Sequence, residues 1–200
     1  MKTLLAIAAL MLASAPAAQA YDSDIEALTA RYKAGKLISG ADVATLMQGS
    51  ERWCYRYEDH SCAWTDIYLD VTKSGAAFEI GNAWNSEVDI AFTDHGRFSD
   101  NRFICETGFD WVPSVRATRR GDGGVIGGRE LAQLKQEIAG VWDAETLDCF
   151  DYLFVSADPV FETITLMQRD FVDGAHVESD DVEVTLFFNA EDAAALMLRE

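Results

Sequence analysis

Acidic side chains offer the most chemistry in this sequence, because two carboxyl groups in one cleft can act as general acid and general base. Such a pair needs surroundings that push the two pKa values apart. Asp66, Asp70 and Glu79 lie in strand-like segments and are candidates for this role. A carboxylate-based hydrolase is therefore one alternative function, although no residue is assigned as catalytic and we expect a protein that is not an enzyme.

The densest acidic run is formed by Glu178, Asp180, Asp181 and Glu183. On a strand, Asp181 and Glu183 would share one face and could hold calcium weakly. We prefer the interpretation that these acids form a charged outward face that prevents pairing at a sheet edge. The turn at residues 94–101 also contains acids, but it lacks the spacing of a calcium loop. We predict no metal site and no cofactor.

Three arginines, Arg116, Arg119 and Arg120, form the one locally basic region. They could hold an anionic ligand or pair with the acidic C-terminal half of the chain, and we expect internal pairing. The glycine-rich stretch 121–128 beside them lacks the Lys-Ser/Thr ending of a phosphate loop. Trp111, which precedes Pro113 in a predicted loop, is expected to be more exposed than the other tryptophans. These arginines, Trp111 and the acidic run are the candidate interaction residues.

The histidines are His60, His95 and His176, and each is expected at the surface. No Gly-x-Ser-x-Gly motif accompanies them, so the sequence contains no recognisable nucleophile for a catalytic triad. Convergence of the histidines and exposed tryptophans in one cleft would favour an enzyme.

The chain has four cysteines, Cys54, Cys62, Cys105 and Cys149, and an even number in an exported protein usually forms disulfides. Of the three possible pairings we favour Cys54–Cys62 and Cys105–Cys149. Loop entropy predicts a contribution of roughly 2.5 kcal/mol from the first bridge and roughly 4 kcal/mol from the second. With all four thiols bonded, none remains as a nucleophile.

The first twenty residues have the pattern of a cleavable signal peptide. Lys2 is followed by an apolar run from Leu4 to Ala13, and the triplet 18–20 reads Ala-Gln-Ala. The apolar run is shorter than the roughly 20 residues that a membrane span needs. We therefore expect a periplasmic or secreted protein that begins at Tyr21 and is not inserted in the membrane.

The formal net charge of −18 bears on the class of partner. Such a charge repels nucleic acid and anionic lipid, and it favours cationic partners. The excess is concentrated in residues 143–200, which hold fifteen acids and only two arginines. No nucleic acid is expected among the ligands, and the sequence does not indicate an oligomeric state.

Helices are predicted near the N-terminus and in the middle of the chain. Ser23 and Glu26 form a capping-box pattern, and a second helix is predicted from Ser39 to Gly49. A third follows the glycine-rich stretch over residues 129–142, and the tail over 190–198 has helical composition.

Strands are predicted by period-two alternation, which suits an antiparallel sheet with one buried face. In residues 62–71, Ile67, Leu69 and Val71 alternate with polar neighbours and are expected to face the core. The remaining predicted strands cover residues 52–57, 76–84, 88–93, 102–109, 149–155, 161–172 and 177–188. Asp173-Gly174 predicts a hairpin turn.

These elements predict an α+β fold with antiparallel sheet and a few short helices packed on one face. Residues 21–120 would hold the N-terminal helices and strands, 121–128 a glycine-rich loop or linker, and 129–200 a helix and further strands packed into the same globule. A faint similarity between residues 38–48 and 126–136 suggests two tandem helix-then-meander units.

The layout resembles small exported proteins of proteobacteria that are known only as uncharacterised. The resemblance rests on the signal peptide, the Ser-Gly-Ala-Asp sequence at 39–42 and the cysteine-bearing hairpin. It implies export and carries no activity.

The expected function is that of an exported binding or inhibitor module that acts on a protein partner. A carrier of a small apolar ligand in a sheet-lined pocket is a second possibility. An enclosed cavity would favour the carrier, and a filled core would exclude it.

Overall fold

The structure is a computed structural model, and it describes residues 21–108, 110–141 and 148–200. The predicted signal peptide, residues 1–20, lies outside the described residues. The described chain is mostly antiparallel sheet with a few short helices, so the predicted α+β class is confirmed. No described helix is long and apolar enough to cross a membrane.

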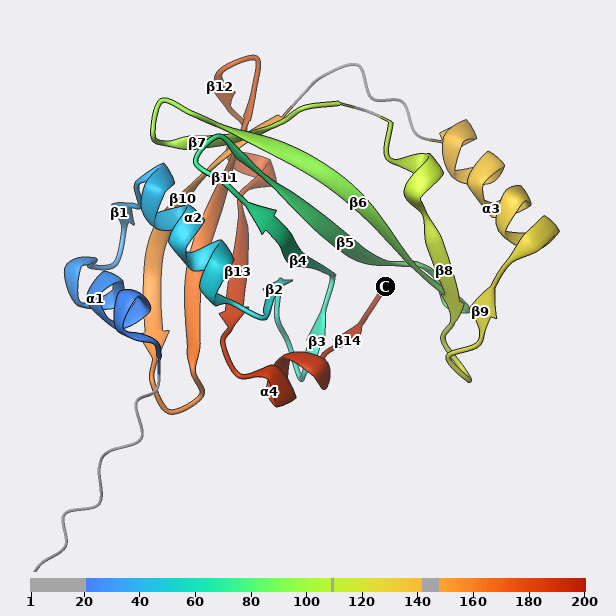
Figure 1. The fold of residues 1–200 in the computed structure, drawn as a ribbon, viewed down its shortest axis with the longest axis horizontal. Coiled ribbons are helices and arrows are strands. Elements are labelled where there is room, and N and C mark those ends of the chain that lie inside the picture. Colours follow the sequence, from blue (N-terminus) through green and yellow to red (C-terminus); the bar gives the residue numbers. More distant parts are fainter. Residues whose placement is uncertain (1–20, 109, 142–147) are drawn as a thin grey trace, which may run out of the picture.

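Eight strands form a closed antiparallel ring, here called the closed sheet (Figure 1). Their order is β10–β11–β13–β2–β4–β5–β6–β7, and β7 closes the ring because it pairs with both β6 and β10. A ring of eight strands encloses a space that side chains fill or that holds one small ligand. The strands are β2 (Arg52–Tyr55), β4 (Trp64–Val71), β5 (Gly75–Asn85), β6 (Val88–Ser99), β7 (Phe103–Glu106), β10 (Asp148–Asp158), β11 (Thr163–Val172) and β13 (Val182–Phe187).

Two helices, α1 (Ser23–Arg31) and α2 (Gly40–Gly49), cover one end of the closed sheet. Helix α2 extends from the β6–β7 turn, where Asn101 accepts a hydrogen bond from the Gly40 amide, to the β4–β5 turn. Its apolar residues join the core inside the ring. Ser39 caps α2 as predicted, whereas α1 is capped by Asp22 rather than by Ser23, because the Asp22 carboxylate accepts from the first free amides.

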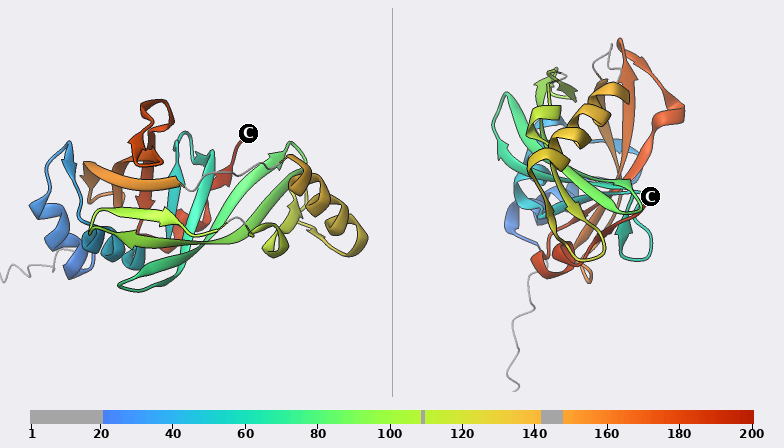
Figure 2. Two further views of the ribbon diagram at one scale, coloured as in Figure 1. Left: turned by 90° about the horizontal axis from the view of Figure 1, so that it is seen from above. Right: turned by 90° about the vertical axis from the view of Figure 1, so that its right-hand side faces the viewer.

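The outer halves of β5 and β6 extend beyond the closed sheet into a second unit, here called the arm (Figures 1 and 2). The arm adds η1 (Val112–Ser114), β8 (Arg116–Arg119), β9 (Val125–Ile126) and α3 (Gly128–Val141). It has its own small core around Ile90, Trp111 and Ile138. The glycine-rich stretch 121–128 contains the β8–β9 turn and β9, so it belongs to the arm.

Shorter elements complete the surface of the molecule. They are β1 (Lys36–Leu37), β3 (Ser61–Cys62), β12 (Ala175–His176), η2 (Glu178–Asp180), α4 (Ala190–Ala194) and β14 (Met197–Leu198). The tail predicted as helix is helical only in α4, because its end pairs in parallel with β3. The strand predicted from Val177 begins at Val182, since residues 178–180 form the η2 turn.

Both favoured disulfides, Cys54–Cys62 and Cys105–Cys149, are present. Cys105 and Cys149 occupy opposing positions of β7 and β10, so this bridge crosses the strand pair that closes the ring. The described cysteines include no free thiol.

Two predictions about the sheet are not met. The strands of the two supposed tandem units join one sheet, so tandem units are not confirmed. In β4 the predicted inward face holds only at Val71, which packs against the main core, whereas Asp66 is buried inside the ring and Leu69 is exposed. A β-bulge shifts the register between Tyr68 and Asp70, so Asp66 and Tyr68 face inward before the bulge and Val71 faces inward after it.

Candidate functional site

A cavity of about 330 Å³, here called the interior cavity, lies inside the closed sheet. Its lining comes from all eight strands of the ring and from η2: Tyr55, Arg56, Trp64, Asp66, Tyr68, Phe78, Ile80, Gly96, Ile104, Glu106, Phe150, Tyr152, Gln168, Asp170, Asp180 and Val182. Arg56 and Asp180 are exposed, whereas Asp66 and Tyr152 are buried. The cavity therefore runs from the end opposite α2 into the middle of the ring.

Asp66 on β4 is the central polar group of this cavity. It is 5% exposed, and its Oδ2 accepts a hydrogen bond of 2.8 Å from the Tyr55 hydroxyl. Its Oδ1 has no hydrogen-bond partner among the described residues. Burial, together with the charge of Asp94, raises the pKa of Asp66 to about 7, although the Tyr55 hydrogen bond acts in the opposite direction.

A short polar network holds Asp66 in place. The Tyr55 hydroxyl also lies 3.2 Å from Gln168 Oε1, which accepts a hydrogen bond of 2.9 Å from Tyr152. The Tyr55 ring stacks on Trp64 with centroids 4.6 Å apart. A buried carboxylate with one unused oxygen thus sits among aromatic rings whose positions are fixed.

Four further acids, here called the outer acids, gather near the exposed end of the cavity. Glu106 ends β7, Asp148 begins β10, Asp170 lies near the end of β11, and Asp180 lies in η2. Burial and the charge of Asp94 raise the pKa of Glu106 to about 7. Burial and the charge of Asp148 raise the pKa of Asp170 to about 6.

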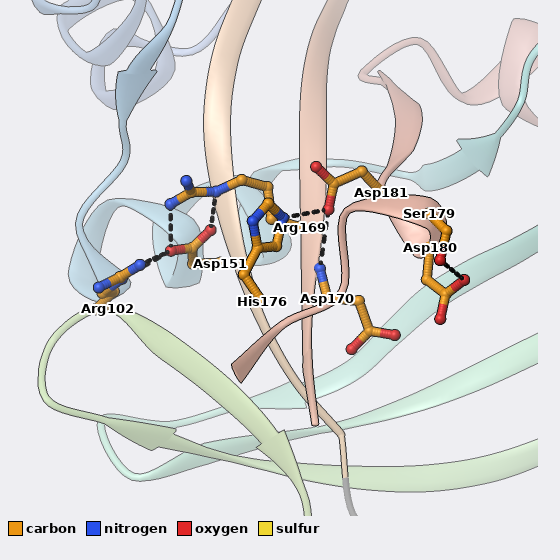
Figure 3. A network of polar contacts seen from close by, with 8 residues as sticks. All are labelled: Arg102, Asp151, Arg169, Asp170, His176, Ser179, Asp180 and Asp181. Atoms are coloured by element: carbon orange, nitrogen blue, oxygen red, sulfur yellow. Dashed lines mark hydrogen bonds and ion pairs between the residues drawn. The ribbon is translucent and has the colours of Figure 1, made fainter. Parts of the chain in front are cut away.

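Arg102 and Arg169 form ion pairs on the outer face of the closed sheet and not in the cavity (Figure 3). Arg102 and Arg169 both bind Asp151, which is 0% exposed, at 2.7 Å. Asp151 alternates along β10 with Phe150 and Tyr152, which line the cavity, so these ion pairs lie on the outside of the ring. Among the lining residues only Arg56 is basic, and its guanidinium lies over Trp64.

Most candidate interaction residues lie away from this cavity. Trp111 is 7% exposed and stacks on Phe92 in the arm core, so the expected exposure is wrong. The arginines are paired internally: Arg116 with Glu79, Arg119 with Glu130 and Arg120 with Asp89. Their carboxylate partners come from residues 79–130 and not from the acidic C-terminal half, because β5, β6 and α3 are their neighbours.

The four acids of the run at residues 178–183 do not form one cluster, because their surroundings differ. Asp180 reaches the cavity, Glu178 and Glu183 are exposed, and Asp181 Oδ1 lies 2.7 Å from His176 Nε2 and also accepts from the Asp170 amide (Figure 3). The interpretation of an edge-blocking face is wrong, because β13 pairs with β11 on one side and β2 on the other.

Residues proposed for catalysis do not converge. Asp66 lies in the cavity, Asp70 is exposed, and Glu79 pairs with Arg116 on the outer face of β5. None of the three histidines lines the cavity. Within the described ranges, no three His, Cys, Asp or Glu side chains are arranged to hold a metal ion.

The sequence did not single out Glu106, Asp148 and Asp170, and it considered Asp94 only as part of the 94–101 turn. A usable signal was present, because several of these acids share a strand face with aromatic residues. Asp148 lies on the same strand face as Phe150 and Tyr152, as Asp66 does with Trp64 and Tyr68. Acids at positions i±2 from aromatic residues mark a strand face that is both enclosed and polar.

A larger groove of about 1200 Å³ lies on the outer side of the sheet, between the arm and the C-terminal segment. Four of its eight charged lining residues pair with each other, in the Arg116–Glu79 and Arg120–Asp89 ion pairs. The interior cavity is the better candidate, since it is enclosed and no described residue forms an ion pair with its acids. Comparison with protein-family models, curated proteins and solved structures finds no match.

Proposed function

We propose that this protein is an exported binding protein that holds a small organic cation inside its closed sheet. The observation that carries the proposal is Asp66, whose buried carboxylate lines an aromatic-rich cavity and has one oxygen, Oδ1, without a hydrogen-bond partner among the described residues. Burying an unpaired charge is costly, so a cationic ligand that donates to Oδ1 would be strongly favoured. Aromatic faces add attraction for ammonium groups.

Among the functions considered from the sequence, this proposal is closest to the ligand carrier. The cavity volume supports a carrier, whereas the acidic lining favours a charged ligand over an apolar one. A hydrolase receives less support, because the pKa values of Asp66 and Glu106 are raised together and not separated. The predicted signal segment and the two disulfides support export.

A protein partner stays a prediction from the charge alone. The exposed acids of residues 178–183 would favour a basic surface on that partner.

Calorimetric titration of the disulfide-bonded protein tests the proposal. Butylamine should bind with a saturable isotherm, whereas butanol and butyrate, which share the alkyl chain, should not. Asp66→Asn should weaken butylamine binding by at least about tenfold, because one charge-assisted hydrogen bond is lost. Asp70→Asn, an exposed acid on the same strand, is the matched control and should leave binding unchanged. Equal binding of butanol, or no binding of any amine, would overturn the proposal.

A further inference from the structure

The interior cavity has carboxylates at two depths. Asp66 lies at the level of Gln168, since the Tyr55 hydroxyl is within hydrogen-bonding distance of both side chains. Asp170 lies two residues further along β11 than Gln168, which is about 7 Å along the strand toward the exposed end of the cavity. The level of Asp66 and the level of the outer acids are therefore about one two-residue strand repeat apart.

Carboxylate oxygens without a hydrogen-bond partner occur at both levels of the cavity. Asp66 Oδ1 is unpartnered at the inner level, and Asp148 Oδ1 and Asp170 Oδ1 are unpartnered at the outer level, among the described residues. Arg102 and Arg169 cannot serve either level from their present positions, because both bind Asp151 outside the ring (Figure 3). Each level thus offers a separate site for a positive group.

The wall between the two levels is aromatic. Phe150 stands opposite Asp170 and Tyr152 stands opposite Gln168 in the β10–β11 register, and both line the cavity. Trp64 and Tyr55 line the β2–β4 part of the cavity and stack on each other. Such a wall suits methylene groups, which bind by burial of apolar surface and need no polar partner.

We propose that the ligand is a short aliphatic diamine, with one ammonium group at Asp66 and the other among the outer acids. This inference rests on the proposed function and specifies its ligand class. A single ammonium group would leave one level of carboxylates uncompensated. A divalent metal ion is a poorer fit, because it needs several oxygen ligands converging on one point.

Putrescine and butylamine form a matched pair of probes, because they share a four-carbon chain and differ in one ammonium group. In calorimetry at about pH 8, where the carboxylates are ionised, putrescine should bind at least about tenfold more tightly than butylamine. Asp66→Asn and Asp170→Asn should each reduce that advantage to less than threefold, since each removes the acceptor for one ammonium group. Asp70→Asn should preserve it.

The outcomes separate this inference from the function on which it rests. Equal affinities for putrescine and butylamine would overturn the diamine while leaving a site for one cation. Absence of binding by either amine would overturn both. Retention of the putrescine advantage in both Asp66→Asn and Asp170→Asn would place the second ammonium group elsewhere and would also refute the inference.

Discussion

Cys105 and Cys149 stand opposite each other where β7 meets β10, with Cα atoms 3.9 Å apart, and their disulfide crosses the closing seam of the ring. The rest of the seam is short, because β7 spans only Phe103–Glu106. The covalent bond therefore secures the strand pair on which the enclosed cavity depends.

Replacing both residues, as in Cys105→Ser with Cys149→Ser, should lower the free energy of unfolding by roughly 4 kcal/mol, as expected for a 44-residue separation. The double change at Cys54 and Cys62, which are eight residues apart, should cost roughly 2.5 kcal/mol. Urea unfolding followed by tryptophan fluorescence measures both. If the Cys54–Cys62 substitutions lowered the free energy of unfolding more than the Cys105–Cys149 substitutions did, the seam disulfide would not be the more stabilising of the two.

Asp151 is bound by both Arg102 and Arg169, and it is fully buried. Asp151→Ala should destabilise the fold by roughly 2–3 kcal/mol, because two guanidinium groups lose their partner while both retain some contact with water. Thermal unfolding measures the loss. Amine affinity at a permissive temperature should be unchanged, since Asp151 lies outside the ring, and a tenfold loss there would refute this placement.

The stability of the ligand-free protein should fall as the pH rises from about 4 to about 7. Burial raises the pKa of Asp66 and Glu106 to about 7, above the roughly 4 of exposed carboxyl groups, so the folded state binds more protons than the unfolded state over this interval. The stabilisation from these two carboxyl groups is fully present below about pH 4, the pKa of a carboxyl group in the unfolded chain, and it is lost as the pH rises through about 7, their pKa in the folded protein. Melting temperatures across this range should show the decline.

Asp66→Asn tests the origin of that pH dependence. The asparagine cannot ionise, so the variant should lose less stability than the parent between about pH 5 and pH 8. Asp70→Asn is the exposed control and should follow the parent profile. Identical slopes for the parent and Asp66→Asn would show that Asp66 does not titrate with a raised pKa.

Amine binding should have the opposite pH dependence. The ammonium group binds the ionised carboxylate, so affinity should rise as the pH passes through about 6 to 7 and should level off above it. The carboxyl groups that line the cavity are Asp66, Glu106, Asp170 and Asp180, and Asp94 and Asp148 lie close enough to act on their charges. The pKa values of Asp66, Asp94, Glu106, Asp148 and Asp170 are raised, and the exposed Arg56 opposes binding at every pH. Calorimetry in buffers of different ionisation enthalpy would also detect the released protons. Affinity that stays constant from about pH 5 to pH 8 would contradict an ionic site.

Several local features could be predicted because their causes lie within a few residues. Ser39 accepts from the Asp42 amide and begins α2, and Asp173-Gly174 forms its turn with positive φ at both positions. The Cys54–Cys62 bridge follows from a short hairpin. The candidate site could not be predicted in the same way, because Asp66, Glu106 and Asp170 lie on strands far apart in sequence that meet only across the ring.

The sequence by itself determined most of the antiparallel strands and the Ser39 cap of α2, since each depends on neighbouring residues, and it favoured the two disulfide pairs that the structure contains. The tertiary structure alone decided which face of each strand is enclosed. Period-two alternation in the first part of β4 places Asp66 on one face with Trp64 and Tyr68 and places Ile67 on the other, and both faces carry apolar residues. Only the pairing of β7 with β10, between residues more than forty positions apart, turns the Asp66 face inward and removes its carboxylate from water.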